Sequence, residues 1–238
     1  MRLYFNGCSH TWGDDLAEPS TTAWPAVLSR NLNAEFLNDS SSGGTNDRII
    51  YCTINNINQF DKFYIAWTYT TRFTRYRSDN NHDVNFNPHL VHSLYGNDSN
   101  FINYGKMHYQ TWHNELYAVK LWLQNIIMLQ RLFETERKPY VMINSNNNHL
   151  DRWLSGRNDF NNNVKSLVCF DHMNDDMLLQ EHYEIQQLIS LIDTTHFVGW
   201  NTWCLTDELR HYPVFKTGHL LEQGHNATAE HILKHDTN

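Results

Sequence analysis

Basic residues are scarce in this chain of 238 residues: 18 Lys and Arg stand against 26 Asp and Glu, for a formal charge of −8. Nucleic-acid binding through phosphates requires clustered basic side chains, so the composition argues against a nucleic-acid partner. No apolar run approaches the roughly 20 residues of a membrane-spanning helix. The opening MRLYFNGCSH has too short an apolar stretch for a secretion signal. We therefore expect a cytoplasmic protein, cellular or virus-encoded, that associates with neither nucleic acid nor membrane.

Cysteine is rare as well. The four cysteines (Cys8, Cys52, Cys169 and Cys204) are widely separated and form no CxxC pair, a pattern typical of reduced thiols rather than disulfides or metal ligands. The sequence also lacks the glycine-rich GxGxxG and GxxxxGK[ST] motifs of nucleotide sites. Several histidines are scattered without the i, i+4 spacing of a zinc helix: His82, His89, His92, His108 and His113. We expect no cofactor and no metal.

Aromatic residues are abundant at 13%, and hydrophobic residues make up 40% of the chain. A chain of this length can bury roughly 70–75% of its unfolded surface, and no repeat or linker divides it. We expect one domain over residues 1–238, with a long excursion at about 73–112 that shapes the site.

Apolar runs alternate with helical patterns along the chain. The predicted strands are Arg2–Asn6, Asp61–Trp67, Tyr140–Asn144 and His196–Trp200. The predicted helices are Asn46–Ile57, Glu115–Glu136, Asp176–Ile192 and Glu222–Lys234. This alternation predicts a three-layer α/β/α sandwich around a mainly parallel, five-stranded sheet.

Ligand sites of such sheets lie beyond the carboxyl ends of the strands. Three segments meet that condition: Gly7–Asp15 after the first strand, Ser41–Asn46 before a helix, and Thr217–His225 before the last helix. A serine needs a base to become a nucleophile, and Ser9 and His219 supply the pair. Ser9 could equally be a helix N-cap, and Asp14 with Asp15 is interpreted as a capping pair or a solvated turn.

In this order the three segments resemble the SGNH (GDSL-like) hydrolase superfamily. Gly7-Cys8-Ser9 is similar to the family's first block, with Cys8 in place of the usual Asp. Gly43-Gly44-Thr45-Asn46 resembles its second block, and His219 through Gly224-His225 resembles its fifth block, with Leu220 in place of the usual proline. The resemblance implies the flavodoxin-like fold of that family, a catalytic Ser9 and His219, and an oxyanion hole that includes Ser9, Gly43 and Gly44.

Two departures from the family pattern affect the expected site. The third block lacks its usual asparagine and reads Thr68-Tyr69-Thr70-Thr71-Arg72, similar to the Trp-Thr…Arg variant of some phage and bacterial members, so Thr68, Thr70 or Arg72 would supply the oxyanion donor. Lys216 stands where the family places the aspartate three residues before the histidine. Asp207 or Glu208 would then support the imidazole, or a backbone carbonyl would leave a Ser-His dyad.

The resemblance implies a serine esterase that forms an acyl-enzyme, and the aromatic excursion favours a carbohydrate or small-molecule ester, an acetyl ester among them. Asn46 is a further supporting residue, and His10, Trp12 and Trp67 are expected to line the pocket. We expect the Ser9 and His219 side chains within hydrogen-bond reach and an acid or carbonyl behind the ring. Open alternatives are an impaired glycan-binding or virion-assembly protein and an acyltransferase. The oligomeric state stays undetermined.

Overall fold

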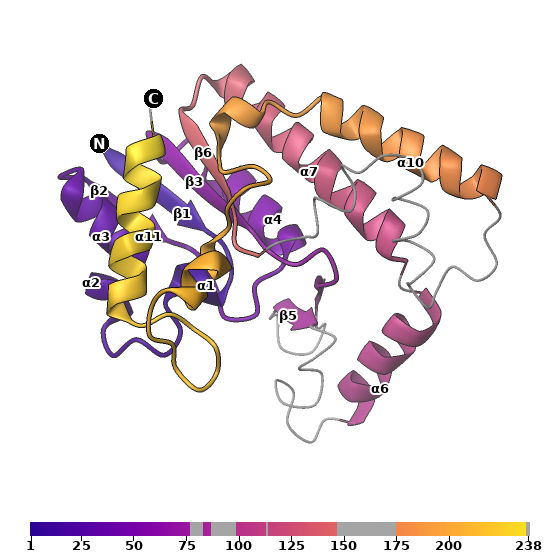
Figure 1. Cartoon of the computed structure of the whole chain (residues 1–238), viewed down its shortest axis with the longest axis horizontal. Helices are drawn as coiled ribbons and strands as arrows, with labels where there is room; N and C mark the ends of the chain where they lie inside the picture. The colour runs from indigo at the N-terminus through magenta and orange to yellow at the C-terminus, as the bar shows by residue number, and fades with distance from the viewer. Residues whose placement is uncertain (77–82, 87–98, 113, 147–174, 237–238) are drawn as a thin grey trace.

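The structure is a computed structural model, and it describes residues 1–76, 83–86, 99–112, 114–146 and 175–236 (Figure 1). A five-stranded parallel sheet forms the centre, in the order β2-β1-β3-β6-β7. Its strands are β1 (Arg2–Asn6), β2 (Glu35–Asn38), β3 (Lys62–Trp67), β6 (Tyr140–Asn144) and β7 (Phe197–Val198). This order is that of a flavodoxin-like, doubly wound sheet. The predicted α/β class is confirmed.

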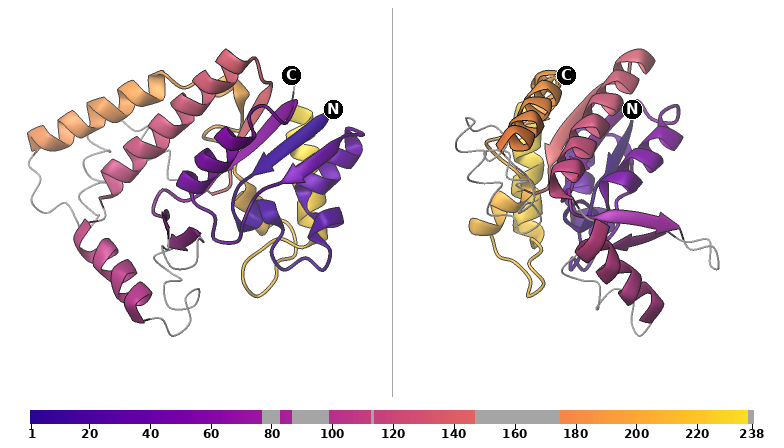
Figure 2. Two further views of the ribbon diagram at one scale, coloured as in Figure 1. Left: turned by 180° about the vertical axis from the view of Figure 1, so that it is seen from behind. Right: turned by 90° about the vertical axis from the view of Figure 1, so that its right-hand side faces the viewer.

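Helices cover both faces of the sheet (Figure 2). One layer consists of α4 (Asn46–Asn56), α7 (Glu115–Glu136) and α10 (Asp175–Ser190), and the other of α3 (Trp24–Asn31) and α11 (Glu222–His235). Short helical turns also occur: α1 (Ser9–Trp12), α2 (Pro19–Thr22), η3 (Thr194–His196) and η4 (Leu205–Arg210). None of the helices in the described ranges combines the length and apolarity that crossing a membrane requires.

Alternate side chains of the central strands enter two separate cores. In β1, Tyr4 packs into the core under α4 and α7, whereas Leu3 and Phe5 pack under α3 and α11. Strand β3 is buried at every position, as expected for a parallel strand covered on both faces. Trp67, expected in the pocket, is fully buried in the core under α4 and α7. That prediction is wrong, because the side chain points from β3 into this core.

The expected excursion over residues 73–112 contains regular structure where it is described. Strands β4 (Phe73–Tyr76) and β5 (Asp83–Phe86) form an antiparallel pair, and they are followed by α6 (Ser99–Met107) and the π-helix η1 (His108–Trp112). Phe73 and Phe86 stack with ring centroids 4.6 Å apart. The remaining residues of this segment, 77–82 and 87–98, lie outside the described residues, as does Cys169.

A buried ion pair fastens the last helix to the middle of the sheet. Lys62 Nζ lies 2.5 Å from an oxygen of Asp236, and the Tyr64 hydroxyl donates a hydrogen bond to the other oxygen of that carboxylate. The Lys62 and Asp236 side chains are only 8% and 4% exposed. Burial, followed by the hydrogen bond to Asp236, raises the pKa of Tyr64 above its ordinary range. The Lys62 ammonium and the Tyr64 hydroxyl therefore both depend on the Asp236 carboxylate.

We predict that Asp236→Asn lowers the free energy of unfolding by about 3–5 kcal/mol, because it removes a carboxylate charge that lies 2.5 Å from a buried ammonium. Urea denaturation at pH 7 measures the loss. Glu230→Gln, the same change at an exposed position of α11, is the control and should stay within about 0.5 kcal/mol of the wild type. Equal stability of Asp236→Asn and the wild type would refute this role.

Candidate active site

Ser9 lies just beyond the carboxyl end of β1, where the chain turns into helix α1. The Gly7 N–H donates to the Asn6 side chain at 2.9 Å. A Cβ on Gly7 would lie 2.4 Å from Thr11 Oγ1, so only glycine allows the helix to return this closely. Cys8, not Ser9, occupies the N-cap, which excludes the N-cap interpretation of Ser9. The Ser9 N–H belongs to the first helical turn, whose N–H groups have no partner within the helix.

The second predicted block packs directly on the first. A Cβ on Gly44 would lie 2.6 Å from the Gly7 carbonyl oxygen, and the Ser41 N–H donates to that same oxygen at 3.4 Å. Gly43 adopts a φ of +67°, which favours glycine. The Gly44 N–H donates to the Ser41 carbonyl at 2.9 Å. The prediction that Gly44 donates to an oxyanion is therefore wrong, since its N–H is already engaged in the turn.

Asn46 fastens the third block to the start of α4. Its side chain accepts a hydrogen bond from the Thr68 N–H at 3.0 Å and donates to the Thr68 carbonyl at 3.2 Å. The expected supporting role of Asn46 is thus structural here. The Thr68 N–H is engaged by Asn46 and is not available to an oxyanion. The Thr68 hydroxyl accepts from Arg72 at 3.0 Å, and its O–H stays a predicted oxyanion donor. Arg72 also donates to the Gly44 carbonyl at 3.3 Å and so connects the second and third blocks.

His219 forms a hydrogen bond with a carboxylate that the sequence analysis did not select. Its Nδ1 lies 2.7 Å from Asp15 Oδ2, and the Thr217 hydroxyl donates to the same oxygen. The His219 and Asp15 side chains are 18% and 20% exposed. Desolvation raises the pKa of the Asp15 carboxyl, but the hydrogen bonds from Thr217 and His219 outweigh it, and the pKa lies below its ordinary value. Asp15 is therefore an ionised acceptor, and Nδ1 of His219 is the donor.

The expectation of an acid or carbonyl behind the ring is confirmed, but its identity is corrected. Asp207 accepts a hydrogen bond from the Cys204 N–H at 2.9 Å, and Glu208 accepts one from the Trp203 indole at 2.9 Å. Both carboxylates thus cap or brace η4 rather than reach His219. Asp14 and Asp15 lie in a turn, and Asp15 is exposed, as one of the two interpretations holds; the contact of Asp15 with His219 is additional, and Asp14 accepts from the Ser42 hydroxyl.

His10, the residue after Ser9, lies against His219. The two rings meet edge to face with centroids 5.1 Å apart, and the place of His10 in a substrate pocket stays a prediction. This contact also shows that the Ser9 turn and the His219 loop meet at one edge of the sheet. Hydrogen bonding between the Ser9 hydroxyl and the His219 ring itself stays a prediction. Trp12 is 43% exposed, and its place in a substrate pocket stays a prediction.

Two histidines of the site are held in their neutral form. Burial, with smaller effects from the charges of His219, Arg72 and His225, lowers the pKa of His10 to about 3. Burial, followed by the charge of His219, lowers the pKa of His225 to about 4. His225 Nδ1 accepts a hydrogen bond from the Trp24 N–H at 3.1 Å, which only the unprotonated nitrogen can do. His219 is therefore flanked by neutral rings.

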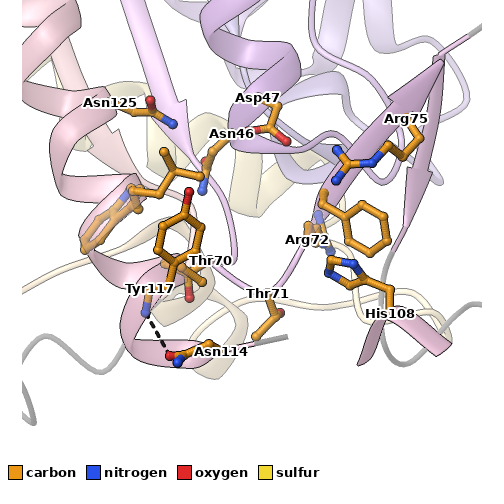
Figure 3. Close-up of a pocket in the computed structure, with 14 residues that line it drawn as sticks. Asn46, Asp47, Thr70, Thr71, Arg72, Arg75, His108, Asn114, Tyr117 and Asn125 are labelled. Carbon is orange, nitrogen blue, oxygen red and sulfur yellow. Dashed lines mark hydrogen bonds between the residues drawn. The ribbon is translucent and has the colours of Figure 1, made fainter. Parts of the chain in front are cut away.

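A cavity of about 430 Å³ opens beside these loops, between the start of α4, the chain after β3 and the start of α7 (Figure 3). Thr70, a predicted oxyanion donor, lines this cavity together with Arg72; its predicted role stays untested. Ser9 and His219 do not line it. Within the described residues, no group of three or more His, Cys, Asp or Glu side chains is arranged to hold a metal ion.

We predict that the folded protein loses stability between about pH 6.5 and pH 4. The unfolded chain protonates His10 and His225 near pH 6.5, whereas the folded chain resists their protonation down to about pH 3 and 4. Because the unfolded state binds more protons in this window, stability falls as pH falls, by up to about 2 kcal/mol per histidine between pH 7 and 5.

Urea denaturation at the two pH values measures this dependence, and the double variant His10→Asn and His225→Asn should lose less stability on acidification than the wild type. Substitution of the exposed His235 by Asn is the matched control. Identical pH slopes in the wild type and the double variant would contradict the assignment.

No curated protein matches the sequence. Among solved structures, the chain is similar to a psychrotrophic esterase from Pseudoalteromonas sp., with 9% identity, a TM-score of 0.48 and coverage of 98% of this chain and 94% of that one. It is also similar to a member of the lipolytic protein G-D-S-L family from Veillonella parvula, with 13% identity, a TM-score of 0.45 and coverage of 98% and 97%. A third is an acetyl xylan esterase, with 8% identity, a TM-score of 0.47 and coverage of 98% of both chains.

The family model that matches the sequence covers residues 14–159. This stretch begins one residue before Asp15, and it includes the Gly43-Gly44 loop, Asn46 and the chain from Thr68 to Arg72. Ser9 and His219 lie outside it. The chain belongs to a family of unknown function, DUF6071.

Proposed function

We propose that the protein is a serine esterase of the SGNH type, in which Ser9 is the nucleophile, His219 the general base and Asp15 the orienting carboxylate. The observation that carries this proposal is the 2.7 Å hydrogen bond between His219 Nδ1 and Asp15. With Nδ1–H donated to an ionised carboxylate, the Nε2 lone pair is the one available to take a proton from a serine hydroxyl.

The reaction follows from these positions. Ser9 Oγ attacks the ester carbonyl while His219 Nε2 takes the hydroxyl proton, and the Asp15 charge stabilises the imidazolium that forms. His219 then returns the proton to the leaving alcohol, and an acyl-enzyme remains. The same base removes a proton from water as the water oxygen attacks the acyl carbonyl. The bond from the acyl carbon to Ser9 Oγ then breaks, the acid leaves, and His219 returns the proton to Ser9.

The oxyanion needs donors that the fold has not already used. In the described part of the chain, the N–H groups of Ser9 and Gly43 donate to no backbone carbonyl. By contrast, the Gly44 N–H donates to a backbone carbonyl, and the Thr68 N–H donates to the Asn46 side chain. We assign the oxyanion hole to Ser9 and Gly43, where one such donor contributes about 3 kcal/mol to transition-state stabilisation. Because Asp15 completes the triad, the protein has the groups that an active hydrolase needs.

We predict that a fluorophosphonate probe labels the wild type at Ser9 and that Ser9→Ala abolishes labelling. The kcat/KM for p-nitrophenyl acetate should fall by about 10³-fold or more, because the remaining groups cannot form the acyl-enzyme. Intact mass spectrometry and absorbance assays measure the two effects. Ser20→Ala, at an exposed serine of α2, is the control and should behave as the wild type. Undiminished labelling of Ser9→Ala would refute the proposal.

We predict that Asp15→Asn lowers kcat for the same ester by about 10²–10⁴-fold with little change in KM, because an amide no longer fixes the tautomer of His219 or stabilises its charged form. The pKa of Asp15 lies below its ordinary value, so the carboxylate is ionised from pH 8 down to pH 5, and its own protonation should not lower the wild-type rate in this range. Steady-state kinetics across this range measure both.

Asp14→Asn is the matched control for that experiment, since Asp14 bonds Ser42 rather than His219. Its kcat should remain within a few fold of the wild-type value. If Asp14→Asn and Asp15→Asn impaired kcat equally, the carboxylates would act on the fold of the loop and not on the imidazole.

A further inference from the structure

The cavity beside the candidate active site concentrates positive charge in an acidic protein. Figure 3 shows Arg72 and Arg75 on one side of it and Tyr117 on the other. Asp47 also lines the cavity, and it accepts a long hydrogen bond of 3.4 Å from the Thr74 N–H. Among the described residues, neither Arg72 nor Arg75 forms an ion pair with a carboxylate. The ion pairs in this part of the chain involve other basic side chains.

The hydrogen bonds of the two guanidinium groups leave donors to spare. Arg75 Nε donates to the Tyr104 hydroxyl at 3.2 Å and its Nη1 to the Thr74 carbonyl at 3.0 Å. Arg72 donates through Nη1 only, and its Nε is buried without a partner. A guanidinium carries five N–H donors in a planar fork that suits carboxylate and phosphate oxygens. Among the described residues, Nη2 of Arg72 and Nη2 of Arg75 bond to no group, so this side of the cavity is suited to an anionic acceptor.

The opposite side offers neutral polar groups and an aromatic ring. Tyr117 is 63% exposed. Asn114 caps the start of α7, Asn125 lies within the same helix, and both line the cavity. The side-chain oxygen of Asn114 accepts from the Tyr117 N–H at 3.0 Å, and this hydrogen bond does not use the side-chain NH₂ group. Amides and an aromatic hydroxyl can bond to the hydroxyl groups of a sugar, and the ring face can cover its C–H surface.

We propose that this cavity binds an anionic sugar, which carries a carboxylate or a phosphate, with the acidic group on Arg72 and Arg75 and the hydroxyl groups toward α7. The inference rests on the proposed esterase function for one point, that this sugar is the alcohol part of the ester. Arg72 makes the connection: it lines the cavity and donates to the Gly44 carbonyl, and Gly44 packs on the turn that holds Ser9. Its charge also contributes to the low pKa of His10.

Binding is tested without turnover, on the full-length Ser9→Ala protein. Ligand-observed NMR titrations compare D-glucuronate with D-glucuronamide, and D-glucose 6-phosphate with D-glucose; in each pair only the first sugar carries an acidic group. We expect at least one of the two acidic sugars to bind, and to bind at least about tenfold more tightly than its partner in the pair, as a charge-assisted hydrogen bond would give. The pair that shows the preference identifies the acid. Equal affinity within both pairs, or no binding of either acidic sugar, would overturn the inference.

Arg75→Gln removes one charge without touching the Gly44 carbonyl. It should reduce the preference for the acidic sugar to within about twofold. Arg131→Gln is the control, because Arg131 is an exposed arginine that pairs with Glu134 farther along α7, and it should leave the preference intact. Retention of the full preference in Arg75→Gln would also overturn the inference.

Turnover by the wild type separates this inference from the proposed function. We expect kcat/KM for the O-acetyl ester of the preferred acidic sugar to exceed that of its neutral partner by at least about tenfold, and Arg75→Gln to remove this ratio through KM. If acidic sugars bind but no ester is cleaved, the esterase proposal fails while the anion site stands. If esters are cleaved without regard to charge, the anionic-sugar inference fails while the esterase proposal stands.

Discussion

The hydrogen bond between Asp15 and His219 joins the two ends of this chain at the candidate site. Asp15 and His219 are 204 positions apart, yet their side chains meet at 2.7 Å. The carboxylate accepts from both the imidazole and the Thr217 hydroxyl, so it fixes the ring and the loop that carries it together. An imidazole on a loop would otherwise have two tautomers and several rotamers to choose from. The orientation of the proposed base depends on this contact, and with it every step of the chemistry.

The charges around His219 fit its proposed role as the general base. Asp15 provides one negative charge at Nδ1, while His10, 5.1 Å away by ring centroids, is kept neutral by its burial. A charged His10 would oppose the imidazolium at close range in a site of low polarity. Arg72 adds a positive charge that lowers the pKa of His10 and so helps to maintain its neutral state. In the proposed mechanism, His219 is therefore the histidine of this group that accepts the proton.

Buried elements of this fold could be predicted from the sequence, and exposed or long-range features could not. The structure reproduces the predicted bounds of β1, β6 and α7, because continuous apolar runs and a clear helical period report burial directly. Strand β2 was not identified, since three of its four residues are exposed and an edge strand carries little apolar signal. Asp15 was missed for another reason: it has a positive φ of 70° and its partner lies at the far end of the chain.

Arg72 connects the Gly43-Gly44 loop, which carries a proposed oxyanion donor, to the cavity beside it. The loop has little freedom at Gly44, where any side chain would strike the Gly7 carbonyl oxygen, and its own carbonyl accepts from the Arg72 guanidinium. That same guanidinium bonds Thr68, whose backbone is held by Asn46 at the start of α4. An anion in the cavity would therefore bind a group that also positions the peptide next to Gly43. In the proposed function, substrate binding and oxyanion stabilisation would therefore share one side chain, and a change at Arg72 would disturb both. Arg75 instead donates to the Tyr104 hydroxyl and the Thr74 carbonyl.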